Sequence, residues 1–242
     1  MKVSAAVFAL MFAVLAALVG GIAASAGAGA QELKMTTYQL VMLNKGPSAG
    51  NASTPEGQKL VKDHVTHLYK LASDGKAMVA GPFRDENDIQ GIIMMKAASP
   101  EQAREFEGAD PAVQAGIFTM EVLPFMSPEG WFGKWAPFGE FETVYFGFLT
   151  RGQNRDQDEE MAKRLQREHL AYMDGQAKEG KLVVAGPFMV DGHRSGIVVY
   201  RVASMEEAKQ RAEADPMVKI GRLSVELHPW QVPKGALPTL PK

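Results

Sequence analysis

The chain contains two copies of one sequence unit. Residues 64–125 align with residues 169–230 at a constant offset of 105 and without a gap. Of these 62 aligned positions, 22 are identical, whereas ordinary residue frequencies would give roughly four by chance. A period near 105 residues is the length of a small domain, not of a solenoid repeat. The sequence therefore predicts a duplicated domain.

Both copies predict the same order of elements from hydrophobic periodicity and capping residues. The first copy predicts a strand at 38–43, a helix at 55–73, strands at 77–80 and 91–96, a helix from Ser99 and a strand at 118–123. The second predicts a strand at 144–149, a helix at 156–178, strands at 182–185 and 196–201, a helix from Ser204 and a strand at 223–228. This βαββαβ order is typical of a ferredoxin-like unit. Such a sheet has helices on one face only, so we expect the two bare faces to cover each other.

The predicted copies and the segments around them divide the chain into five parts. They are a signal peptide at 1–30, a first domain at 36–125, a connector at 126–142, a second domain at 143–230 and a tail at 231–242. The connector holds Trp131, Phe132, Trp135, Phe138 and Phe141. A flexible linker would not be so aromatic, so we expect the connector to pack on the protein. The Pro-rich tail predicts an arm or a disordered end.

The N-terminus has the pattern of a secretory signal. Lys2 precedes a nearly uncharged run over residues 3–30, which ends in Ala28-Gly29-Ala30 before Gln31. A short apolar region followed by small residues of the A-x-A type is typical of a cleaved signal peptide. The alternative is an uncleaved membrane anchor. We expect cleavage, a periplasmic or secreted protein, and no membrane partner afterwards.

Composition excludes several classes of function. The net charge of −2 gives no basic excess, so we expect no nucleic-acid partner. With 46% hydrophobic residues the chain is too apolar to be disordered. It contains no cysteine, which excludes disulfides, thiolate metal sites and thiol nucleophiles.

Two polar residues recur at the same positions in both copies. His64 and His169 lie in the apolar stripe of the predicted first helix, and Asp110 and Asp215 each precede a proline. A core histidine and a helix N-cap are sufficient structural explanations for these residues taken singly. Together they form a possible dyad, in which the carboxylate fixes the tautomer of the imidazole and the imidazole transfers protons. Each pair is separated by 46 residues, so only the fold brings its members together.

The signal for a metal is weak. His67 follows His64 by three residues, but the second copy has Tyr172 there, and no H-E-x-x-H motif is present. We predict no metal and no cofactor. No phosphate-binding glycine loop is found either.

Several motifs of the second copy resemble one known family. They are His-Leu-Ala-Tyr-Met from His169, Ala-Gly-Pro-Phe from Ala185, Ala-Ser-Met-Glu-Glu-Ala from Ala203, Ala-Asp-Pro-Met-Val from Ala214 and a final His-Pro-Trp ending at Trp230. This pattern resembles the YciI-like, or YCII-related, domain, and the first copy has the same landmarks with Phe125 in place of the tryptophan. The resemblance implies an α+β fold, the dimeric α/β-barrel usually made by two chains. Here the tandem copies would supply both halves, and a homo-oligomer remains open.

The resemblance also implies a function. Family members carry a His–Asp pair that is proposed as the active site, which corresponds to His169 with Asp215 and to His64 with Asp110. A few relatives act as lyases or isomerases on chlorinated hydroxyaromatic compounds or lactones. We expect acid–base chemistry on a small aromatic or carbonyl compound, with His169 as acid or base and Asp215 as its orienter. The alternatives are a non-catalytic module that binds a small ligand, and haem binding through a histidine as in other α/β-barrel families.

Overall fold

The computed structural model describes residues 34–133 and 139–238. The segment for which we predict a signal peptide lies outside the described residues, as do Trp135 and Phe138 of the connector. Within the described ranges, no helix is both long and apolar enough to cross a membrane.

Apart from one short 3-10 helix in the first half, the two halves contain the same elements in the same order. The first half consists of β1 (Met35–Lys45), a short 3-10 helix (Ala49–Ser53), α2 (Pro55–Ser73), β2 (Ala77–Pro82), β3 (Ile89–Met95), α3 (Pro100–Gly108), α4 (Pro111–Gln114) and β4 (Phe118–Pro128). The second consists of β5 (Phe141–Arg151), α5 (Glu159–Lys178), β6 (Leu182–Pro187), β7 (Arg194–Tyr200), α6 (Met205–Glu213), α7 (Pro216–Lys219) and β8 (Leu223–Pro233). The βαββαβ order predicted for each copy is confirmed, with an extra helical turn (α4 or α7) before the last strand.

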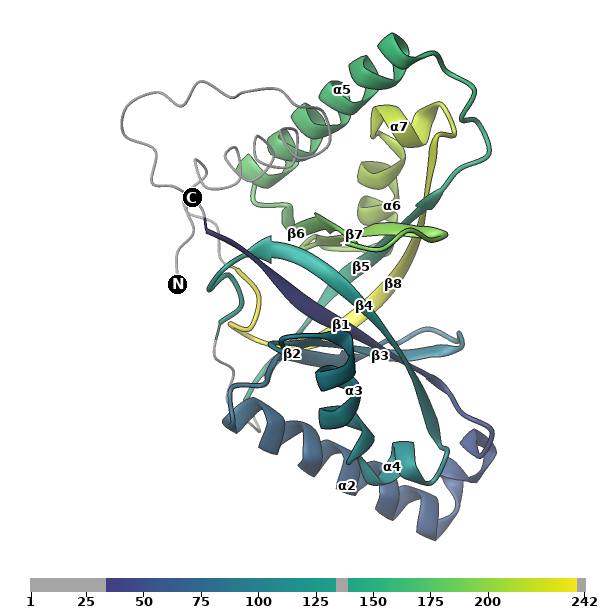
Figure 1. The fold of residues 1–242 in the computed structure, drawn as a ribbon, viewed down its shortest axis with the longest axis vertical. Coiled ribbons are helices and arrows are strands. Elements are labelled where there is room, and N and C mark those ends of the chain that lie inside the picture. Colours follow the sequence, from purple (N-terminus) through teal and green to yellow (C-terminus); the bar gives the residue numbers. More distant parts are fainter. Residues whose placement is uncertain (1–33, 134–138, 239–242) are drawn as a thin grey trace.

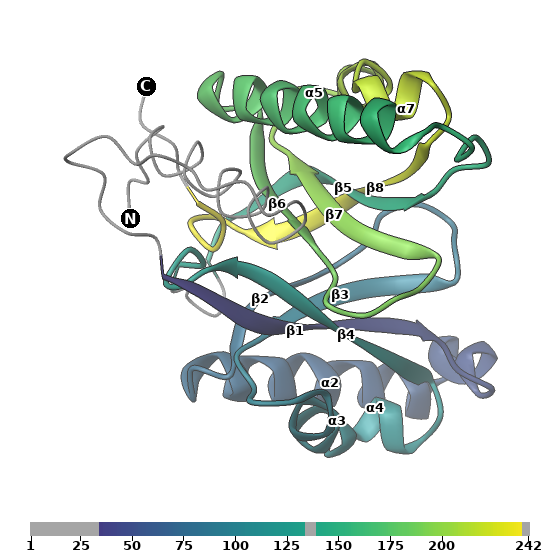
Figure 2. The ribbon, with the colours of Figure 1, turned by 45° about the horizontal axis from the view of Figure 1, so that its top comes forward.

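Each half forms one antiparallel sheet of four strands. The strand order is β2-β3-β1-β4 in the first and β6-β7-β5-β8 in the second. Figure 2 shows the two sheets facing each other, with α2 to α4 outside one and α5 to α7 outside the other. Buried side chains of both sheets form one central core, with Met42 and Ile92 from the first and Phe146 and Val199 from the second. The expected mutual covering of the bare sheet faces is therefore confirmed.

The outer strands extend further than the sequence pattern indicates. β4 continues to Pro128 and β8 to Pro233, because each pairs with β1 or β5 along an 11-residue ladder. The tail is therefore not an arm from residue 231 onward: Gln231 to Pro233 are in the sheet, and Ala236 and Leu237 are buried. Trp131 and Phe132 of the connector are also buried, as its aromatic composition predicts. Phe141 differs, because it begins β5 and is 43% exposed.

The repeated Ala-Gly-Pro-Phe segments lie where the two halves meet. Phe83 bridges to Trp230 and Phe188 bridges to Phe125, and the Trp230 indole N–H donates to the carbonyl of Gly81 at 2.9 Å. A Cβ on Gly81 would lie 1.8 Å from the carbonyl oxygen of Gln231. Glycine is therefore required at this position by the close approach of β8 to β2.

We expect Gly81→Ala to destabilise the protein by about 1–3 kcal/mol, because the new methyl group must push two strands apart. The free energy of unfolding in urea measures the loss. Gly108→Ala is the matched control, since a Cβ there meets nothing within 4 Å. Equal stability of the two variants would show that the halves do not meet at Gly81.

Candidate functional site

In the first half, the predicted histidine and aspartate meet. His64 lies on the inner side of α2, and Asp110 caps the N-terminus of α4. Nδ1 of His64 lies 2.7 Å from Oδ2 of Asp110. The other carboxylate oxygen, Oδ1, accepts hydrogen bonds from the backbone N–H groups of Ala112 and Val113, at 2.8 and 3.2 Å. The Asp-Pro motif thus serves both roles weighed from the sequence: Asp110 caps a helix and binds the imidazole.

The same geometry recurs in the second half. Nδ1 of His169 lies 2.6 Å from Oδ2 of Asp215, and Oδ1 accepts a hydrogen bond of 2.8 Å from the Met217 N–H. All four side chains are buried or nearly so. The fold therefore brings together the members of both predicted pairs.

The carboxylate determines which nitrogen of His64 remains available. Burial alone would raise the pKa of Asp110, but the hydrogen bond from His64, the charge of His64 and the two backbone N–H groups lower it below its ordinary value. Asp110 is therefore ionised at neutral pH and accepts the Nδ1 proton of His64. Nε2 of His64 has no hydrogen-bond partner within residues 34–133 and 139–238. At Nε2 such an imidazole is a base when neutral and an acid when protonated.

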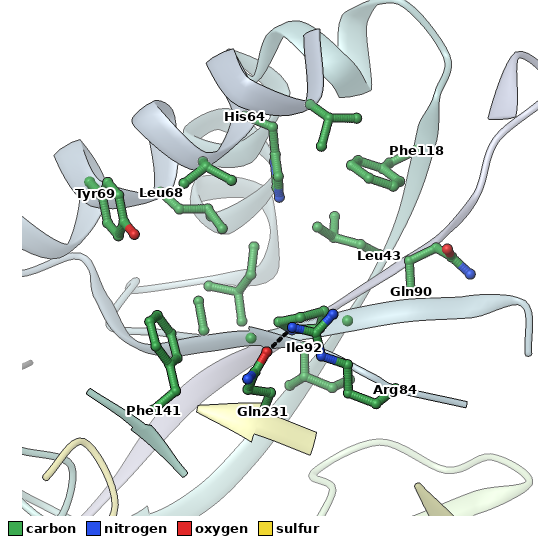
Figure 3. Close-up of a pocket in the computed structure, with 17 residues that line it drawn as sticks. Leu43, His64, Leu68, Tyr69, Arg84, Gln90, Ile92, Phe118, Phe141 and Gln231 are labelled. Atoms are coloured by element: carbon green, nitrogen blue, oxygen red, sulfur yellow. Dashed lines mark hydrogen bonds between the residues drawn. The ribbon is translucent and has the colours of Figure 1, made fainter. Parts of the chain in front are cut away.

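A cavity opens next to His64. Its volume is about 530 Å³, which is enough for a small organic molecule. Figure 3 shows the His64 ring extending from α2 into it, among apolar side chains from both the helix and the sheet. Leu43, Leu68, Ile92 and Phe118 belong to this lining.

In the second half, Trp131 packs with the residues equivalent to this lining, and we call this the filled region. Val65, Leu68, Ala80 and Ile93 line the first cavity, and the repeat offset matches them with Leu170, Met173, Ala185 and Val198. Ala80 and Ile93 are buried like their counterparts, so the difference lies at Val65 and Leu68 on α2. These four counterparts pack with Trp131 in a single buried cluster. Exposure follows the same contrast, since Val65 is 39% exposed and Leu170 only 6%.

Trp131 explains why one half is open and the other filled. It lies three residues after Pro128 at the end of β4, and its counterpart, three residues after Pro233 of β8, is Ala236. Ala236 has no side chain long enough to reach across the first half. The duplicated histidines thus lie in different surroundings, one beside an open cavity and one beside a filled region.

Sequence comparison assigns the family. The model of the YCII-related domain matches residues 39–126 and residues 148–231. The chain belongs to the YCII-related domain family. It carries two such domains in tandem, as the motifs predict. No curated protein matches the sequence.

Solved structures similar to this tandem YCII-related protein show the same fold. Chlorite dismutase from Candidatus Nitrospira defluvii in complex with imidazole has a TM-score of 0.52 and 13% identity, over 83% of this chain and 92% of that one. A single-substitution mutant of that enzyme in complex with cyanide has a TM-score of 0.53 and 12% identity over the same shares. At these identities the likeness concerns the dimeric α/β-barrel fold, which is therefore confirmed.

Sequence reasoning missed one buried ionisable residue beside the first His–Asp pair, Glu107. It lies on α3, is completely buried, and neither carboxyl oxygen has a hydrogen-bond partner in the described parts of the chain. Burial and the nearby charge of Asp110 raise its pKa to about 8. Burial also lowers the pKa of His67, whose Nε2 lies 3.8 Å from Glu107. At pH 7 both groups are mostly neutral.

The second copy offers the signal that would have revealed Glu107. Its counterpart is Ala212, and both positions follow a buried alanine by four residues on the same helix face. A glutamate on such a face is unusual. His64, Glu107 and Asp110 place one ligand atom each within 4.8 Å of one another. A cation there would have to displace the proton of Glu107 and the hydrogen bond between His64 and Asp110.

We expect burial of Glu107 to make stability depend on pH. Between its ordinary pKa of 4.5 and its folded pKa of about 8, the folded chain keeps a proton that the unfolded chain has lost. The free energy of unfolding therefore falls as pH rises through this window, by about 1.4 kcal/mol per pH unit. Glu107→Gln removes this contribution, so its advantage over the wild type should grow between pH 5.5 and 7.5. The exposed Glu105→Gln is the control, and identical pH slopes for wild type and Glu107→Gln would contradict the assignment.

Proposed function

We propose that this protein is an acid–base enzyme that works at the cavity of its first half, on a small and largely apolar aromatic or carbonyl compound. The observation that carries the proposal is the placement of His64. Its Nδ1 is held by the ionised Asp110, and its ring lines a cavity of about 530 Å³. An oriented imidazole beside an apolar, ligand-sized space is an arrangement suited to general acid–base catalysis.

The proposed step is the transfer of one proton. Nε2 of His64 takes a proton from a carbon adjacent to a carbonyl group, the C–H electron pair moves into an enolate, and the imidazolium is stabilised by Asp110. The imidazolium then returns the proton to a different carbon, as in an isomerase, or to a leaving group, as in a lyase. Neither outcome needs an oxidant, a reductant or a metal.

The position of the cavity changes which His–Asp pair we propose as the catalytic one. The motifs alone give the leading role to His169 with Asp215, because the second copy matches the family better. In the structure it is His64 that lines the cavity, while the region beside His169 contains Trp131. We therefore propose His64 and Asp110 as the working pair and a structural role for the second pair. Export from the cytoplasm remains part of the proposal, supported by the N-terminal pattern.

One observation favours a second candidate, a non-catalytic module that binds a small ligand. The His169–Asp215 pair is retained beside a filled region, so such a pair can serve only to tie α5 to α7. In that case His64 would likewise be structural, and the cavity would only hold a ligand.

Proton exchange distinguishes the two candidates. Small aromatic ketones, lactones and hydroxyaromatic compounds are incubated with the protein in deuterated water, and incorporation of deuterium at carbon is followed by NMR. Thermal shifts of the protein report binding of the same compounds. An enzyme exchanges protons in at least one compound that it binds. Thermal stabilisation without exchange across the whole panel would establish the binding module.

A further inference from the structure

The cavity is lined by an unusual set of charges. Of the 17 described residues that line it, only His64, Tyr69 and Arg84 are ionisable, and none is an aspartate or glutamate. Arg84 carries a permanent positive charge. Among the described residues, a ligand in this cavity therefore meets one fixed cation and no carboxylate, against walls that are mostly apolar. This charge pattern favours a ligand with one negative charge.

The structure holds Arg84 in place for such a ligand. Its backbone N–H donates to the carbonyl of Pro229 at 2.9 Å, and its side chain donates to the side-chain oxygen of Gln231. No carboxylate lies within ion-pair distance of Arg84 in residues 34–133 and 139–238. Figure 3 shows Arg84 and Gln231 on the side of the cavity opposite His64. One N–H donates to Gln231, and the remaining donors of the guanidinium fork suit a carboxylate.

The second half shows that this polar pair is not required by the fold. The repeat offset matches Arg84 with Met189 and Gln231 with Met126. Met126 packs against the buried cluster that contains Trp131, so the filled half has methionines where the open half has an arginine and a glutamine. The arginine and the cavity thus lie in the same half, and the equivalent place in the other half has methionines and the packed Trp131.

We infer that the cavity takes a small carboxylate with an apolar or aromatic body, bound by Arg84 and Gln231. The carboxylate lies at the guanidinium and the body contacts Leu43, Ile92 and Phe118. The opposite end of the ligand then points to His64. Only this last point rests on the proposed function, because binding of the carboxylate needs no chemistry at His64.

The test measures binding of benzoate and of benzamide, its uncharged analogue, by calorimetry on the full chain at low ionic strength. We expect benzoate to bind at least tenfold more tightly than benzamide. Arg84→Gln should remove this preference, because a hydrogen bond to a charged group is lost, and should leave benzamide affinity unchanged. Met189→Gln makes the same new side chain at the counterpart position and should change neither affinity.

His64→Gln separates this inference from the proposed function. It should keep the benzoate preference, since the carboxylate contacts Arg84 and not His64. A preference that survives in His64→Gln and disappears in Arg84→Gln supports the carboxylate site even if no compound exchanges protons. Equal affinity for benzoate and benzamide, or a preference that survives in Arg84→Gln, would overturn the inference.

Discussion

Replacement of Trp131 by alanine is expected to lower the free energy of unfolding by about 3–5 kcal/mol. Trp131 is 3% exposed and packs with α5, α6, β6 and β7 residues of the second half. Removing its indole leaves a cavity that the surrounding helix and sheet fill only in part. Urea denaturation measures the loss.

The same substitution should also open a cavity in the second half like the one beside His64. The emptied region lies beside residues equivalent to those that line the cavity at His64, so Trp131→Ala should bind a small apolar probe such as benzene in the second half. Trp131→Phe retains most of the ring and should lose less stability and bind less probe. A loss of under 1 kcal/mol, or no new binding, would mean that another side chain fills the second half.

His64→Gln is expected to lower kcat/KM for proton exchange by about 10²–10⁴-fold, the usual contribution of a general acid or base. His169→Gln is the matched control. Both substitutions break a hydrogen bond of nearly the same length to a buried aspartate, 2.7 and 2.6 Å. They should therefore cost similar stability, about 1–3 kcal/mol, whereas only the His64 variant should lose activity.

This comparison removes the ambiguity of a single histidine variant, because loss of folding would affect both proteins. Activity and the free energy of unfolding are measured on the same preparations. If His169→Gln loses as much activity as His64→Gln, the second pair is also catalytic. If neither loses activity, the histidines are structural and the cavity is only a binding site.

The sequence predicts the fold because the same hydrophobic periodicity and capping residues occur in both copies. The helix at Pro55–Ser73 has the predicted bounds, and Ser99 and Ser204 cap their helices as expected. The strand ends are less predictable, since Gln231 to Pro233 are held in β8 by pairing with distant residues of β5. Long-range pairing of this kind leaves no local signal.

The sequence predicts only those features of the site that the two copies share. The offset of 105 identifies both His–Asp pairs, and their 46-residue separation is closed by the fold in each half. The difference between the halves depends on Trp131, which lies outside the aligned window and packs on the other copy. Glu107 was not predicted for a related reason. Its burial depends on which face of α3 packs on the sheet, and the sequence pattern does not specify that face by itself.

The central claim is that only one of two equivalent His–Asp pairs meets a ligand. The most direct test is an NMR spectrum of the histidine side-chain nitrogens, recorded as the tightest-binding compound of the panel is added, with His64→Gln and His169→Gln to assign the signals. We predict that Nε2 of His64 shifts on binding and that both nitrogens of His169 keep their positions. A shift at His169, alone or equal to that at His64, would contradict the claim.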